Sequence, residues 1–117
     1  MVLVVHVKNH IKLKRENMDS KLTTVQYWED NWSDIKLPLI RKPSYDLFCT
    51  FNKYLPSGRK DICLIEIGCA PGGWLAFFYK NFGYHVRGIE YAQRASEITN
   101  KNLMMQNVEA TIMVEDF

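Results

Sequence analysis

The amino-acid sequence predicts an α/β fold built around a parallel sheet. The run "ICLIEIG" at 62–68 is almost continuously apolar, as is typical of a strand buried on both faces of a parallel sheet. From residue 61 onwards, strand-like and helix-like segments alternate, and this alternation is typical of parallel α/β units with right-handed crossovers. The glycine-rich stretch "GCAPGG" at 68–73 follows the first strand directly, where such folds turn from a strand into a helix.

The 117 residues are enough for one small domain, which we place at 23–117, with 1–22 as an N-terminal extension. Val2–Val7 has the composition of a strand. A second methionine, Met18, leaves open that the first 17 residues lie outside the fold or form a flexible basic tail. Ser44 can cap a helix that runs to about Leu55, with one apolar face.

The predicted elements of the α/β unit follow in order. Strands are expected at 62–67, at "HVRGIE" (85–90) and at "EATIMVED" (109–116). Between them, helices are expected from Gly72 to Phe82, ended by Gly83, and from Ala92 to about Met105.

Composition narrows the class of protein. A net charge of +2 gives no clear signal for a nucleic-acid partner. The three cysteines include no C-x-x-C pair, so neither a disulfide framework nor a metal site is predicted. The N-terminal apolar run is too short for a membrane span. We therefore expect a cytoplasmic protein with no membrane partner and no metal.

The glycine turn discriminates between possible ligands. It lacks the lysine of a phosphate-binding P-loop, and its glycine spacing does not match G-x-G-x-x-G. Glu66, at the end of the first strand, would repel a pyrophosphate but attract a cation. S-adenosylmethionine fits, because Glu66 can hold its ammonium group. The small residues of the turn (Gly68, Cys69, Ala70 and Gly72) would line the approach of the ligand to the backbone.

Acidic residues also end the next two strands. Glu90 lies 22 residues after Gly68, near the spacing at which a carboxylate meets a ribose, and Tyr91 could lie against the adenine. Asp116 could accept from the adenine amine, with Phe117 beside the ring. Ligands of open parallel sheets bind outside the carboxyl ends of the strands, so we expect these residues to form one site.

The stretch "EIGCAPGGWLAFF…VRGIEYAQRASEITNKNL…VEDF" resembles the cofactor half of class I S-adenosylmethionine-dependent methyltransferases, most closely their small-molecule-type domains. Glu66, Gly68 and Gly72 match the first motif of that family, with Ala70 where many members have glycine. Glu90 and Asp116 match the second and third motifs. The resemblance implies a Rossmann-like sheet, an S-adenosylmethionine cofactor and a small-molecule methyl acceptor.

The same resemblance implies that part of the domain is missing. Family members have seven strands in the order 3-2-1-4-5-7-6, and this sequence supplies three. We therefore expect a sheet truncated after the third strand, with an exposed apolar edge at "CLIEI". The catalytic residues remain unknown, and we expect that this chain alone does not turn over. The oligomeric state is not predicted.

Three alternatives remain. "GCAPGGW" is also similar to the turn of FtsJ-type RNA ribose 2′-O-methyltransferases, whose lysine before the first strand could correspond to Lys53. That family generally has aspartate where Glu66 stands. A non-catalytic, methyltransferase-like binding module is a second alternative, and a nicotinamide-binding domain is a third.

Overall fold

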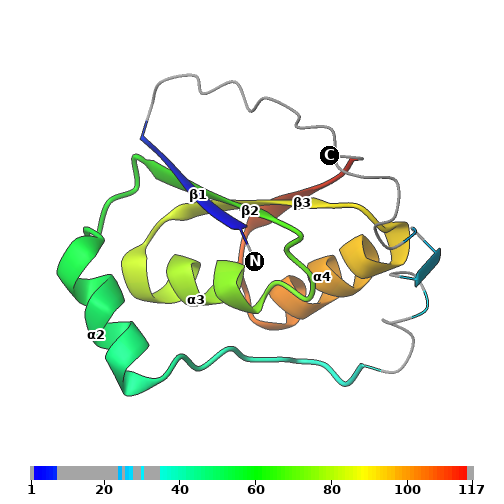
Figure 1. The fold of residues 1–117 in the computed structure, drawn as a ribbon, viewed down its shortest axis with the longest axis horizontal. Helices are drawn as coiled ribbons and strands as arrows, with labels where there is room; N and C mark the ends of the chain where they lie inside the picture. The colour runs from blue at the N-terminus through cyan, green and yellow to red at the C-terminus, as the bar shows by residue number, and fades with distance from the viewer. Residues whose placement is uncertain (1, 8–23, 25, 28–29, 31–34, 116–117) are drawn as a thin grey trace.

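The computed structural model describes residues 2–7, 24, 26–27, 30 and 35–115, with residues 2–7 described by their backbone. Four strands and three helices have defined bounds (Figure 1). In chain order they are β1 (Val2–Val7), α2 (Tyr45–Tyr54), β2 (Ile62–Ile67), α3 (Gly73–Phe82), β3 (His85–Glu90), α4 (Gln93–Met105) and β4 (Ala110–Val114).

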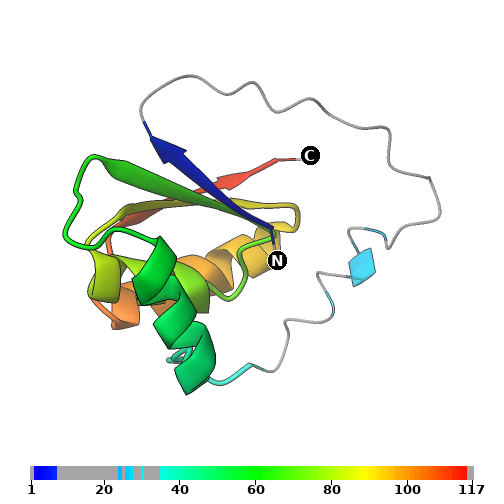
Figure 2. The same ribbon diagram turned by 60° about the vertical axis from the view of Figure 1, so that its left-hand side comes forward.

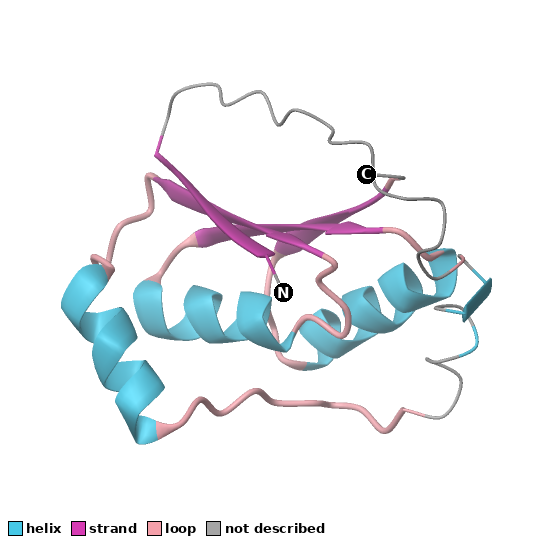
Figure 3. Cartoon of the chain, viewed as in Figure 1, coloured by secondary structure: helices cyan, strands magenta, loops and turns pink. Residues whose placement is uncertain are grey.

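The sheet has the strand order β1-β2-β3-β4. Strands β2, β3 and β4 are parallel, with Leu64 opposite Val86 and Val86 opposite Ala110. Both crossover helices, α3 and α4, cover the same face of the sheet (Figure 3). The predicted α/β fold with three consecutive parallel strands is therefore confirmed.

Strand β1 corrects the expectation of an exposed edge at β2. It pairs antiparallel with β2 along its whole length, from Val2 opposite Ile67 to Val7 opposite Ile62. An edge strand presents unpaired backbone groups, and a valine-rich extended segment can satisfy them. Residues 8–22 lie outside the described residues, so the boundary between extension and domain stays a prediction.

Burial of β2 differs between its two faces. Ile62, Leu64 and Glu66 are buried under the helices, whereas Cys63 and Ile65 on the other face are half-exposed. The expectation of a strand buried on both faces is therefore met on one face only among the described residues. The apolar residues on the second face of β2 are therefore only partly covered by the described part of the chain.

Helix α2 has the predicted cap and apolar face, and the structure packs that face on α3. Ser44 caps it, its side chain accepting from the backbone N–H of Leu47 at 3.3 Å. The Phe51 ring lies 5.8 Å from the Trp74 ring and 5.1 Å from the Phe78 ring, measured between centroids. This aromatic contact fixes α2 against the start of α3.

An extended segment, residues 35–43, crosses the helices on the side away from the sheet (Figures 1 and 2). We call it the strap. Asn102 on α4 holds it: its side chain accepts from Leu39 N–H at 2.8 Å and donates to Leu39 C=O at 3.1 Å. Gln106 donates to the same carbonyl at 3.2 Å. The strap is thereby tied to α4 by specific hydrogen bonds that the sequence pattern did not predict.

Candidate functional site

The candidate site lies at the turn 68–72, which joins β2 to α3 at the carboxyl ends of the parallel strands. Glu66, one residue before the end of β2, and Glu90, the last residue of β3, both lie on the buried, helix-covered face. The structure therefore brings the first two predicted acids to one end of the sheet. Asp116 and Phe117 lie outside the described residues, and their predicted roles stay predictions.

Glycine is needed at two positions of the turn for different physical reasons. Both have positive φ, +69° at Gly68 and +89° at Gly72, a conformation that favours glycine. A Cβ at Gly68 would meet nothing within 4 Å, so this side of the turn is open. A Cβ at Gly72 would lie 2.9 Å from Thr99 Cγ2 on α4. Gly72 is therefore required by helix packing, whereas Gly68 leaves space for a ligand.

Glu66 is a buried carboxylate with an unsatisfied oxygen. Its side chain is 3% exposed, and Oε1 has no hydrogen-bond partner among the described residues. Burial, aided by the negative charge of Glu90, raises the pKa of Glu66 to about 8, although the positive charges of the chain's N-terminus and, less strongly, of Arg41 oppose the shift. An unpartnered buried carboxyl group is costly unless a ligand or ion satisfies it. A cationic group bound at this point would offset that cost.

Glu90 connects the second strand to the glycine turn. Its Oε2 accepts from Ala70 N–H, and its Oε1 accepts from Tyr91 N–H, both at 3.0 Å. An ionised carboxylate has about four acceptor positions, so two hydrogen bonds leave capacity for a ligand hydroxyl. Tyr91 is half-buried beside it. Glu90 thus has a structural role in the turn and also remaining acceptor capacity.

Cys69 fills space within the fold. It is 2% exposed, and its Sγ occupies the position that a Cβ at Gly88 would need. Burial, with the nearby Glu90 and Glu66, raises the pKa of the Cys69 thiol to about 12. A thiol held neutral in this way is not a nucleophile.

The N-terminus of α3 has no capping side chain. Its N-cap residue is Gly72, and its first turn contains no acidic residue. The first amides of a helix have no intrahelical acceptor, and the helix dipole favours an anion there. The Glu66 carboxyl group before the turn therefore suits a cation, and the helix amides after the turn suit an anion.

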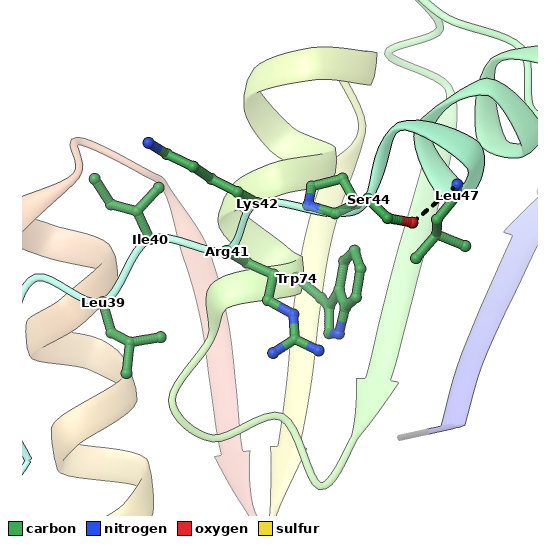
Figure 4. Close-up of a pocket in the computed structure, with 8 residues that line it drawn as sticks. Leu39, Ile40, Arg41, Lys42, Ser44, Leu47 and Trp74 are labelled. Carbon is green, nitrogen blue, oxygen red and sulfur yellow. Dashed lines mark hydrogen bonds between the residues drawn. The ribbon is translucent and has the colours of Figure 1, made fainter.

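An open pocket of about 400 Å³ lies beside this helix terminus, between the strap and α3. Arg41 and Trp74 lie side by side in it (Figure 4). Its lining residues are Leu39, Ile40, Arg41, Lys42, Pro43, Ser44, Leu47 and Trp74. Sequence reasoning missed this pocket, because the strap approaches α3 only through long-range contacts.

The lysine of the RNA-methyltransferase alternative lies elsewhere. Lys53 is in the last turn of α2, with its Nζ 5.1 Å from the Tyr54 ring centroid. Figure 1 shows that α2 ends near the start of β2, at the opposite end of the strand from the glycine turn. Lys53 therefore does not join the acids at the carboxyl ends of the strands.

In the part of the chain that the structure describes, no group of three or more histidine, cysteine, aspartate or glutamate residues is placed to hold a metal ion. None of the helices in that part combines the length and the apolar character needed to cross a membrane.

Comparison with solved structures identifies the fold. One similar solved structure comes from work on the conversion of a disulfide bond into a thioacetal group during echinomycin biosynthesis. It aligns with 79% of this chain, with a TM-score of 0.55 and 17% sequence identity. An S-adenosylmethionine-dependent methyltransferase from Thiobacillus denitrificans, in complex with S-adenosyl-L-homocysteine, matches 81%, with a TM-score of 0.51 and 15% identity.

The chain spans 39% and 37% of the lengths of these two proteins. No protein-family model and no curated protein matches the sequence. At such identities the likeness establishes the fold: the described α/β unit has the class I methyltransferase fold.

Proposed function

We propose that this chain binds S-adenosylmethionine and forms the cofactor side of a methyltransferase. The observation that carries the proposal is the unsatisfied carboxyl group of Glu66, buried at the glycine turn before the uncapped N-terminus of α3. The cofactor has an ammonium group and a carboxylate on one carbon, and the two halves of this site suit one charge each. The fold supports the same assignment.

The residues of this chain would bind and orient the cofactor. Glu66 would hold the ammonium group, and Gly68 would leave room for the ligand beside the turn. Glu90 would accept from the ribose hydroxyls with its remaining lone pairs, and Tyr91 would lie against the adenine. When bound, the cofactor supplies an electrophilic methyl group. The contribution of the chain is to fix the position of that group.

For the methyl acceptor, we propose a small molecule. The RNA alternative depends on a lysine near the reacting centre, and the position of Lys53 at the far end of β2 gives it no support. A non-catalytic binding module would share the fold without affinity for the cofactor. Calorimetry separates this alternative from the proposal.

The test is titration of the full chain with S-adenosyl-L-homocysteine, the product form of the cofactor. We expect the unmodified chain to bind, and Glu90→Ala to abolish binding. Glu109→Ala is the matched control: it removes an exposed carboxylate just before β4, outside the glycine turn, and this variant should bind normally. No binding by the unmodified chain would overturn the proposal. Normal binding by Glu90→Ala would remove the ribose role from Glu90.

A further inference from the structure

The strap places Arg41 directly on the first residue of α3. A Cβ at Gly73 would lie 2.9 Å from Arg41 Cβ, so the two residues are packed as closely as glycine allows. Two residues earlier, both backbone polar groups of Leu39 are hydrogen-bonded to the Asn102 side chain. The backbone of Arg41 is therefore fixed at the helix terminus.

The Arg41 side chain is also held in position. Its guanidinium carbon lies 4.7 Å from the centroid of the Trp74 ring, within the range of a cation–π interaction. Figure 4 shows the Lys42 side chain extending to the other side of the strap. Among the described residues, Arg41 has no salt-bridge partner. A guanidinium ordered by an aromatic ring but not paired with a carboxylate is available to an anion.

The charge of Arg41 also acts on the turn, because it lowers the pKa of Glu66 against the effect of burial. The end of β2 therefore carries an unsatisfied carboxyl group. At the start of α3, beside its uncapped amides, lies a guanidinium that has no salt-bridge partner in the described part of the chain. An α-amino acid group, with an ammonium and a carboxylate on one carbon, complements this pair of charges.

We propose that Arg41 is a specificity residue that binds the carboxylate of the amino-acid end of the ligand, together with the first amides of α3. This inference rests on the proposed function. It adds to the cofactor site a residue of the strap, which lies outside the motifs at the ends of the three strands. It implies that the site discriminates strongly against adenosine thioethers that lack the amino-acid group.

The experiment compares two ligands and three variants by calorimetry. S-adenosyl-L-homocysteine carries the amino-acid group, and 5′-methylthioadenosine lacks it. Losing a hydrogen-bonded charge pair costs about 10- to 100-fold in affinity. We expect Arg41→Gln to weaken binding of S-adenosyl-L-homocysteine by about that factor and to leave binding of 5′-methylthioadenosine unchanged. Arg41→Lys should restore part of the loss. Lys36→Gln, which removes an exposed lysine from the same strap outside the pocket lining, is the matched control and should change neither affinity.

The outcomes are distinguishable. If the unmodified chain binds S-adenosyl-L-homocysteine and Arg41→Gln binds it equally well, this inference is overturned and the proposed function stands. Equal weakening of both ligands would assign Arg41 a structural role and would also overturn it. If the unmodified chain binds neither ligand, the proposed function fails and this inference fails with it. Thermal unfolding of each variant shows whether the chain is folded.

Discussion

Asn102 on α4 and Leu39 on the strap exchange two hydrogen bonds through the Asn102 side-chain amide and both backbone polar groups of Leu39. The same side chain donates to the carbonyl of Pro71, in the glycine turn, at 2.8 Å. One fully buried amide therefore joins the strap, the turn and α4. Since the strap carries Arg41, the position of that side chain depends on Asn102.

Replacing Asn102 by alanine should destabilise the protein by about 2–4 kcal/mol, because it removes the hydrogen-bond partner that the structure shows for Leu39 N–H and for Pro71 C=O and leaves Leu39 C=O with the Gln106 bond only. Urea unfolding at equilibrium measures this change. Asn100→Ala, at an exposed position on the same helix, is the control and should change stability by less than about 0.5 kcal/mol. Equal effects at the two positions would show that the amide does not hold the strap.

Gly72 should tolerate alanine less well than Gly58, although both have positive φ. At Gly58 a Cβ meets nothing within 4 Å, so the change costs only the left-handed conformation, about 1–2 kcal/mol. At Gly72 the Cβ also meets Thr99 and Leu103, which adds about 1–3 kcal/mol. Urea unfolding of the two alanine variants compares them directly. If the two variants lose the same free energy of unfolding, close packing of α4 against Gly72 does not contribute to stability.

The pairing of β1 with β2 can be tested with proline at Val4 and at Val5. Consecutive amides of a strand point to opposite edges, so only one of these two residues can donate to β2. We expect one proline variant to lower the melting temperature and to increase light scattering, as the apolar edge of β2 becomes exposed. The other variant serves as its control. Two harmless substitutions would contradict the pairing.

The sequence predicted local elements well because their signals are local. Ser44 and Gly83 mark helix ends by their own chemistry, and the structure confirms both. The partner of β1 was not predictable, because a valine-rich strand can pair with any open edge. The Asn102 contact was also missed, since it joins residues 63 positions apart and a buried asparagine has no periodic signal.

The same contrast holds for the candidate site: residues with a local signal were predicted from the sequence, and residues placed by long-range contacts were not. Glu66 was identified because it interrupts an apolar strand with a charge, and the structure shows it buried and unsatisfied. The spacing to Glu90 indicated an acid at the next strand end, but not its hydrogen bond to Ala70. Arg41 gave no signal, because it stands among ordinary basic residues and reaches α3 only through the fold.

The raised pKa of Glu66 makes stability depend on pH in a definite direction. In the unfolded chain this carboxyl group titrates near 4.5, and burial moves its pKa to about 8 in the folded chain. The folded state therefore holds the proton more tightly. The cost of ionising Glu66 is absent below about pH 4.5, grows as the pH rises towards 8, and is constant above. One pKa unit corresponds to about 1.4 kcal/mol.

Glu66→Gln should remove this dependence, because glutamine keeps the shape of the side chain and does not ionise. Without ligand, we expect the variant and the unmodified chain to melt at similar temperatures at pH 5, and the variant to melt at the higher temperature at pH 8.5. Glu109→Gln, at an exposed position, should follow the unmodified chain at both pH values. Thermal unfolding across this range measures the difference. If the variant instead becomes less stable than the unmodified chain as the pH rises, the predicted direction is wrong. That result would mean that a cation already stabilises the ionised Glu66 in the folded chain.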